Sequence, residues 1–252
     1  MKKWLKLSWP VLAMTLFAFQ SSFLSEQLKF QRVRKASEEK KPQLESTLKN
    51  KGLKLSDFQM MLIAYKESDE LELYVKSKND KAYSKLKAYK ICAKSGTLGP
   101  KNKKGDAQVP EGFYHIDRFN ASSNFYLSLG LNYPNAADRK RSKAANLGGD
   151  IFIHGNCVTI GCMPMTDDKI KEIYLCAVHA KNNGQKNIPV YVFPFNMKEQ
   201  NMLFYKEKFK NNKELIQFWE NLKKGYDAFQ ADKQELKFLV GGSGEYVFIR
   251  GN

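Results

Sequence analysis

The stretch that decides the fold and draws attention to one site is Phe152-Ile153-His154-Gly155-Asn156-Cys157-Val158-Thr159-Ile160-Gly161-Cys162-Met163-Pro164-Met165. It opens with apolar, strand-like residues and sets a histidine eight residues before a cysteine that glycine precedes. A thiol attacks as the thiolate, and a neighbouring imidazole commonly lowers its pKa and takes its proton. Glycine before the cysteine lets the backbone turn sharply and brings N–H groups close to a substrate carbonyl. The pattern predicts Cys162 as a nucleophile of depressed pKa, served by His154.

The cysteine count leaves two other interpretations to weigh. The chain has four cysteines, and an even count in an oxidising compartment invites pairing. Cys157 could pair with Cys162, but alternation along an extended segment sends them to opposite sides, which disfavours a direct bridge. A zinc site is disfavoured because no second closely spaced Cys or His pair supplies a fourth ligand. We therefore expect no metal and no cofactor, and structural or incidental roles for Cys92, Cys157 and Cys176.

Length and charge bound the classes of function. A chain of 252 residues, 42% of them hydrophobic, can bury one substantial core or a core with a small appendage. Its 42 Lys and Arg against 26 Asp and Glu give a formal net charge of +16. Such a charge favours anionic surroundings, here an envelope surface of cell-wall polymers or phospholipid. Without a recognisable nucleic-acid motif we expect no nucleic-acid partner, and most of these lysines should simply be solvated.

The first residues resemble an export signal. Three lysines precede an uncharged, mostly apolar stretch over residues 7–25. We expect residues 1–25 to be a signal peptide or an N-terminal anchor in the inner membrane, and the mature protein to work in the periplasm or cell envelope. The alternatives of cleavage and retention stay open, because 19 uncharged residues approach the roughly 20 that span a bilayer. Residues 26–56 carry mixed charge and are expected to form a helical or flexible stalk.

From residue 57 the pattern changes to strands separated by turn residues. We expect a catalytic domain over residues 57–195 that is mainly β with flanking helices, its sheet mostly antiparallel, and a helical extension with a closing strand over residues 196–252 that braces it. Thr166 should cap a helix whose apolar face packs on the sheet, with His179 on the solvated side. The expected strands are 60–65, 71–75, 86–92, 113–118, 150–154, 188–193 and 245–249, and the expected helices are 166–180, 197–209 and 213–229.

Several blocks in this order resemble the L,D-transpeptidase (YkuD-like) catalytic domain family, in particular its branch of exported murein enzymes that includes the one releasing Braun's lipoprotein from peptidoglycan. The resemblance covers residues 59–195. It is carried by Leu98-Gly99-Pro100-Lys101, Gly105-Asp106, Val109-Pro110-Glu111-Gly112-Phe113-Tyr114, Phe119-Asn120, Ser128-Leu129-Gly130-Leu131-Asn132-Tyr133-Pro134-Asn135, Ile153-His154-Gly155 and Gly161-Cys162. It implies a β-sandwich or barrel-like domain.

The resemblance also implies a chemistry. Cys162 would attack the amide at the L-centre of meso-diaminopimelate in a peptidoglycan stem peptide and form a thioester, with His154 as general base and acid. Gly155 and Gly161 would shape the site, and the N–H of Cys162 with a neighbouring amide would stabilise the oxyanion. An amine would resolve the thioester in transpeptidation. Water would resolve it in hydrolysis, which includes release of a wall-linked lipoprotein. A catalytically silent wall-binding protein is the alternative from another class.

One departure from the family pattern concerns substrate binding. Many members carry a second histidine before the glycine and an arginine two residues after the cysteine, where this chain has Ile160 and Pro164. The donor's carboxylates then need another cation, and Arg118, Arg139 and Arg141 are candidates. The remaining predicted substrate-binding residues are Thr159, which would hold the imidazole or the turn, Tyr133 and Asn135, which flank a proline at the expected cleft, and His115.

Overall fold

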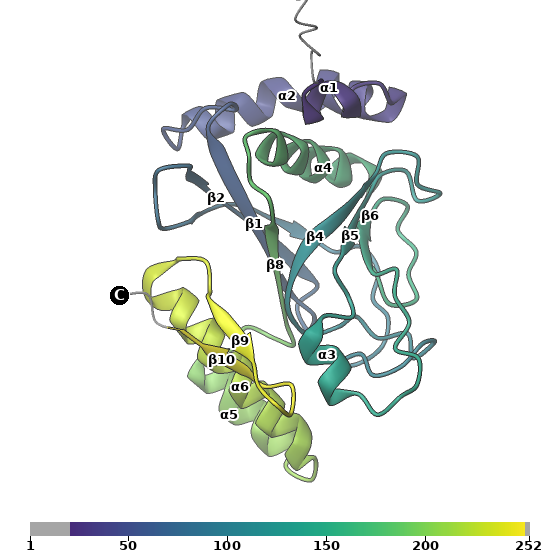
Figure 1. Ribbon diagram of the computed structural model, residues 1–252, viewed down its shortest axis with the longest axis vertical. Coiled ribbons are helices and arrows are strands. Elements are labelled where there is room, and N and C mark those ends of the chain that lie inside the picture. The colour runs from purple at the N-terminus through teal and green to yellow at the C-terminus, as the bar shows by residue number, and fades with distance from the viewer. Residues whose placement is uncertain (1–20, 250–252) are drawn as a thin grey trace, which may run out of the picture.

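The computed structural model describes residues 21–249, and the core of the molecule is one curled sheet of eight strands (Figure 1). The strand order is β3-β2-β1-β8-β4-β5-β6-β7. The pairs β1–β8 and β6–β7 are parallel and the others antiparallel. The strands are β1 (Phe58–Tyr65), β2 (Glu70–Ser77), β3 (Ser84–Lys90), β4 (Gly112–Asn120), β5 (Ser128–Leu131), β6 (Phe152–His154), β7 (Met163–Pro164) and β8 (Ile188–Phe193).

The predicted mainly β fold with flanking helices is confirmed. The central strands form where the sequence carries the longest apolar runs, and β8 is buried along its whole length. The short strands β5 and β7 escape prediction because four and two residues are too few to show a period. The sheet is mostly antiparallel as expected, and its two parallel pairs are additions that the sequence pattern did not reveal.

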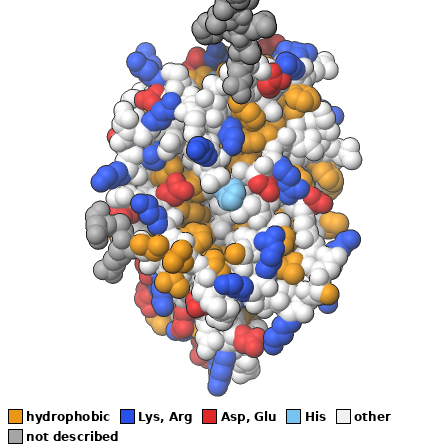
Figure 2. Space-filling view, in the orientation of Figure 1, with side chains coloured by type: hydrophobic (Ala, Val, Ile, Leu, Met, Phe, Trp, Pro, Cys, Tyr) orange, Lys and Arg blue, Asp and Glu red, His pale blue; other side chains and the backbone are white. Residues whose placement is uncertain are grey.

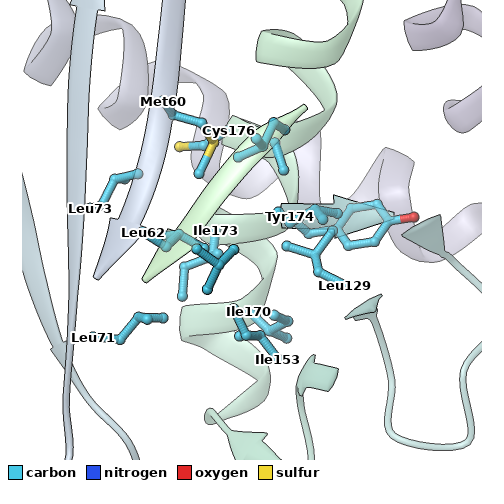
Figure 3. Packing of buried hydrophobic residues seen from close by; sticks show 14 of the residues in the cluster. Met60, Leu62, Leu71, Leu73, Leu129, Ile153, Ile170, Ile173, Tyr174 and Cys176 are labelled. Atoms are coloured by element: carbon cyan, nitrogen blue, oxygen red, sulfur yellow. The ribbon is translucent and has the colours of Figure 1, made fainter. Parts of the chain in front are cut away.

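Helix α4 (Asp167–Asn182) covers one face of the sheet and organises the larger core. Thr166 caps it as predicted, its side chain accepting the N–H of Lys169 at 3.4 Å. Figure 3 shows Ile170, Ile173 and Tyr174 of this helix packed against Leu62, Leu129 and Ile153 of the sheet. The prediction that His179 is solvated is wrong. A second layer of helix covers that side of α4, so His179 is buried and its pKa falls to about 4, chiefly through desolvation.

That second layer consists of α1 (Phe23–Gln27) and α2 (Gln31–Lys49) (Figure 1). The buried face of α2 is formed by Val33, Ala36, Leu44 and Leu48. The segment expected as a stalk is thus helical but lies against α4, because four apolar side chains at helical spacing give it a face to bury. In α1, the ring of Phe23 packs edge-on against the ring of Phe119, with 5.0 Å between the ring centroids. The last residues of the stretch 7–25, which was expected to be a signal or anchor, therefore belong to the folded domain.

The remainder of the expected signal or anchor, residues 1–20, lies outside the described residues. Within residues 21–249, no helix combines the length and the apolar character needed to cross a bilayer.

The opposite face of the sheet carries the C-terminal extension: α5 (Glu199–Lys208), α6 (Lys213–Asp232) and the two-stranded pair β9 (Phe238–Val240) and β10 (Tyr246–Phe248). Trp219 and Phe229 of α6 are fully buried in a second apolar cluster with β1 and β8 residues. A short helix, α3 (Ala136–Arg141), follows β5. Figure 2 shows basic side chains scattered over one face of the molecule among acidic and neutral ones rather than gathered in one patch.

Candidate active site

The candidate site lies at the β6–β7 edge of the sheet. The two strands pair in parallel with Ile153 beside Met163 and His154 beside Pro164. Ile153 and Met163 are buried in the core. Because side chains alternate along a strand, His154 points to the face opposite Ile153. The pairing thus brings Cys162, which directly precedes Met163, beside the strand that ends in His154.

The imidazole of His154 is fixed by its own loop. Its Nδ1 lies 2.6 Å from the carbonyl oxygen of Gly155. Its ring packs against the ring of Phe125, with 4.6 Å between the ring centroids. A carbonyl oxygen only accepts hydrogen bonds, so Nδ1 carries the proton and Nε2 keeps a free lone pair. Burial lowers the pKa of His154 from its usual 6.5, with the bond to Gly155 acting in the opposite sense. The ring is thus held neutral in the tautomer that can accept a proton at Nε2.

The thiol of Cys162 is half-buried and donates to the carbonyl oxygen of Asp150, with sulfur and oxygen 3.5 Å apart. The pKa of this thiol is raised above the usual 9.0, chiefly by desolvation and to a smaller extent by the Asp150 carboxylate. A hydrogen bond with the backbone of Phe152 and the charge of Lys101 act in the opposite direction. The predicted depressed pKa is therefore wrong for the resting site, because burial outweighs the nearby cation. A neutral thiol beside a neutral base can still react if the base takes the proton as the sulfur attacks.

Thr159 holds the turn that presents Cys162. Its hydroxyl accepts the N–H groups of Gly161 at 3.2 Å and of Cys162 at 2.8 Å, and donates to the carbonyl of Cys162 at 2.8 Å. Of the two roles considered for this residue, the hydrogen bonds correspond to the turn. They also engage the N–H of Cys162 that the family resemblance implies as an oxyanion donor.

Both glycines of the segment sit where a side chain would collide. A Cβ on Gly155 would come within 2.6 Å of the Asp167 carboxylate and 2.9 Å of the Phe125 carbonyl. Gly161 has a φ of +130°, and a Cβ there would lie 3.1 Å from the Gln108 carbonyl oxygen. Close backbone approach thus fixes these two positions as glycine.

A disulfide joins Cys92, just past β3, to Cys157 in the loop between β6 and β7. Among the described cysteines, Cys162 and Cys176 are free, and Cys176 lies on α4 with its side chain buried in the hydrophobic core. The backbone N–H of Cys92 also bonds the carbonyl of Pro164 at 3.0 Å. The β6–β7 segment is therefore tied to the 91–98 segment by one covalent link and one hydrogen bond. The sequence shows that the chain has four cysteines, but it does not show which two of them form the disulfide.

Arg118 is the predicted cation that comes nearest to this edge. It crosses the space above Gly130, whose missing side chain leaves room for it, and stacks on the ring of Phe152 at 4.8 Å. Its guanidinium pairs with Asp150 at 2.7 Å and with Asp117 at 3.1 Å. Arg118 thus pairs with the same Asp150 whose carbonyl oxygen accepts the hydrogen bond of the thiol, and the charge of Arg118 is already compensated.

Four other predicted residues lie away from Cys162. Tyr133 is buried and its hydroxyl donates to the Leu147 carbonyl at 3.2 Å. Asn135 caps α3, and its side-chain amide donates to the Phe113 carbonyl at 3.0 Å. His115 lines a groove under β9 together with Asn135. Arg139 is exposed in the last turn of α3. The side chains of Tyr133 and Asn135 therefore stabilise their own loop and do not line the cavity beside Cys162.

A cavity of about 240 Å³ opens beside the thiol. It lies between the end of β1, the 91–98 segment and helix α5. Its lining residues are Ala64, Lys66, Glu67, Asp69, Ile91, Ala93, Lys94, Ser95, Gly96, Thr97, Leu98, Val109, Cys162, Met163, Tyr205 and Lys208. Sequence reasoning missed most of this wall, because the residues come from segments far apart in the chain.

Comparisons with known proteins identify the family. The family model of the L,D-transpeptidase catalytic domain, YkuD, matches residues 62–192. "Putative L,D-transpeptidase YafK" of Escherichia coli K12 is 40% identical over 185 residues, which cover 73% of this chain and 71% of that protein.

Two solved structures are also similar. The helical cell shape determining protein Pgp2 of Campylobacter jejuni has a TM-score of 0.44 at 18% identity, with 73% of each chain covered. Bd1075 of Bdellovibrio bacteriovorus has a TM-score of 0.40 at 21% identity, covering 69% of this chain and 63% of that one. On the family match and the 40% identity, the chain belongs to the L,D-transpeptidase catalytic domain family, which acts on peptidoglycan.

Proposed function

We propose that the protein is an exported cysteine acyl-transfer enzyme of peptidoglycan. Cys162 attacks the carbonyl at the L-centre of meso-diaminopimelate in a stem peptide, the amide bond to the next residue breaks, and a thioester remains. His154 takes the thiol proton at Nε2 and returns it to the leaving amine. The observations that support this proposal are the free thiol of Cys162 at the edge of a cavity, and the β6–β7 pairing that brings its segment beside the strand ending in His154.

The amine of a second peptide then resolves the thioester, which is L,D-transpeptidation. Hydrolysis uses the same thioester with water as the acceptor, and it includes release of a wall-linked lipoprotein. The half-buried thiol and the closely packed loop around it favour transfer, because partial exclusion of water protects the intermediate. Export is supported by the Cys92–Cys157 disulfide, a bond typical of oxidising compartments.

The first experiment tests the nucleophile. Carbapenems acylate this family, so incubation of the protein with a carbapenem should add one drug mass to the intact protein. The Cys162→Ala variant should show no adduct. Cys176→Ala is the matched control, since it removes the other free thiol, which is buried in the core. An unmodified wild-type protein, or an adduct that persists in Cys162→Ala, would refute the proposal.

The second experiment separates the acceptors. Purified protein is incubated with tetrapeptide muropeptides and, separately, with protein-linked peptidoglycan. New cross-linked dimers are the expected product. Release of tripeptides or of free protein without dimers would assign hydrolysis, and no turnover together with salt-sensitive sacculus binding that survives Cys162→Ala would assign the silent wall-binding role.

A further inference from the structure

Positive charge is concentrated in the N-terminal helical layer, far from the chemistry proposed above. Residues 21–56 form α1, α2 and the turn that follows α2, and they contain nine Lys and Arg against four Glu. About a third of the formal net charge of +16 therefore lies in about a seventh of the chain. A layer of this charge attracts anionic partners.

Several of these cations are used within the protein. Arg32 and Arg34 donate to backbone carbonyl oxygens, and each thereby stabilises the fold around α2. The Lys41 ammonium lies 3.8 Å from the Glu45 carboxylate, so these two charges compensate each other. An external anion would gain little from cations that already have partners.

Three other lysines have no such partner and form what we call the lysine cluster: Lys49, Lys51 and Lys54. Lys49 ends α2, and the other two follow in the turn. All three are exposed, and in the described part of the chain their ammonium groups have no ion-pair or hydrogen-bond partner. Like charges at such short sequence separation repel each other, and a bound anion would relieve this repulsion.

A groove of about 590 Å³ opens beside the lysine cluster, between α1, α2 and the end of α4. Lys49 and Lys54 line it together with three half-buried leucines, Leu24, Leu53 and Leu55. A hydrophilic polyanion would match the lysines but not the leucines. A phospholipid matches both, because its phosphate adjoins the methylene groups of its acyl chains.

The described chain begins at this groove. Leu24 of α1 lines the groove, and its backbone N–H donates to the side chain of Asn182 on α4 at 3.0 Å. In Figure 1, α1 lies beside α2 at one end of the molecule, and α5 and α6 lie at the other end. The residues before α1 were expected to be an export signal or a membrane anchor. The groove is thus the part of the described structure that adjoins this expected membrane segment.

We infer that the end of α2 and the turn after it dock on an anionic phospholipid bilayer. The lysine cluster contacts lipid phosphate groups, and the leucines of the groove contact the first methylene groups of an acyl chain. This surface does not involve Cys162 and does not depend on the proposed reaction. Because the attraction is largely electrostatic, it weakens as the salt concentration rises.

The test measures the accessibility of individual lysines on the full chain. The protein is mixed with phosphatidylcholine vesicles that contain or lack phosphatidylglycerol, exposed amines are briefly acetylated, and mass spectrometry measures the acetylation of each lysine. At low salt the anionic vesicles alone should protect the lysine cluster. The exposed Lys198, Lys210 and Lys213, at the starts of α5 and α6 and between them, should stay reactive. The comparison holds whether or not the N-terminal segment inserts in the bilayer.

Charge variants measure the contribution of the cluster. Lys49→Gln combined with Lys54→Gln should lower the ratio of protected to reactive Lys51 by roughly 30-fold, which corresponds to about 1 kcal/mol for each lysine. Lys210→Gln combined with Lys213→Gln removes the same charge at the other end of the molecule and should leave the ratio unchanged.

Three results would overturn the inference. The first is a lysine cluster that stays fully reactive on anionic vesicles, and the second is equal protection at both ends of the molecule. The third is protection by isolated sacculi but not by anionic vesicles, which would assign the surface to an anionic polymer of the wall. Failure of the proposed function is seen separately, as absence of the carbapenem adduct at Cys162.

Discussion

The centre of the sheet and its β6–β7 edge are built by different means. At the centre, β1 and β8 are eight and six residues long, apolar, and buried almost throughout. At the edge, β6 and β7 have only three and two residues. The edge is held by the Thr159 hydroxyl, by glycine contacts and by a disulfide. Stability at the centre is spread over many apolar contacts, while geometry at the edge depends on a few polar and covalent ones.

The largest expected effect is on chemistry at the edge. His154→Gln should lower the rate of Cys162 acylation by about 10²–10⁴-fold, the usual contribution of a general base. The amide can still donate to the Gly155 carbonyl, so the fold should persist. Time-resolved mass spectrometry of the carbapenem adduct measures the rate. A loss below about tenfold would mean that another group takes the proton.

At the centre, Leu62→Ala should destabilise the protein by about 2–5 kcal/mol, because it opens a cavity in a fully buried layer. Urea unfolding measures the change. Acylation of the folded fraction should stay within about twofold of wild type, since Leu62 does not line the site. A parallel loss of rate in fully folded protein would show that the two regions are not separable.

The disulfide tests how the edge is tied down. Replacing Cys92 and Cys157 together by serine should cost about 2–4 kcal/mol in the free energy of unfolding. Hydrogen exchange should rise in residues 155–162 and stay low in β1 and β8. Cys176→Ala serves as the comparison because it alters a core cysteine that is not cross-linked. Exchange that increases evenly over the sheet would contradict a local tether.

Thr159→Val probes the turn alone. It removes the three hydrogen bonds that the hydroxyl makes within the turn and the one to the Ser95 hydroxyl, while preserving the shape of the side chain. It should lower the acylation rate by about tenfold, with a loss of about 1–3 kcal/mol in stability. Thr159→Ser should restore both, because the hydroxyl returns. A Val variant that acylates faster than wild type would instead mean that Thr159 competes with the substrate for the Cys162 N–H.

The smallest effect is the response to pH. His154 has a lowered pKa, so it stays a neutral base down to a pH below 6.5, and the acylation rate should fall only on further acidification. Cys162 has a raised pKa, so iodoacetamide labelling without substrate should increase through pH 9 and beyond. Rapid labelling that is complete and flat at neutral pH would indicate a preformed thiolate.

The sequence predicted the centre better than the edge. Residues 188–193 show a continuous apolar run, and β8 occupies these same residues. The expected helix over residues 213–229 is present and extends to Asp232. Such elements are predictable because each displays its apolar pattern within its own residues. His179 was misplaced because the helix that covers it lies more than a hundred residues earlier in the chain.

The residues of the candidate site, like the elements of the fold, were predictable from the sequence only in part. The segment from His154 to Cys162 could be singled out because its chemistry is local. The Cys92 partner, Asp150 and the α5 residues of the cavity could not, since only the tertiary fold brings them to Cys162. Asn135 was predicted to line the cleft, but its side chain forms a capping box with Asp138. The sequence signal for that role was an Asn followed three residues later by an Asp.

The Cys92–Cys157 link has a consequence for biogenesis. Glutathione and thioredoxin keep such thiols reduced in the cytosol, so a newly made chain carries an untethered catalytic loop until it meets an oxidant. Under the proposed export, the loop is tethered only after the chain has left the cytosol. Protein produced in a reducing host should titrate four thiols when unfolded, and protein recovered from an oxidising one should titrate two.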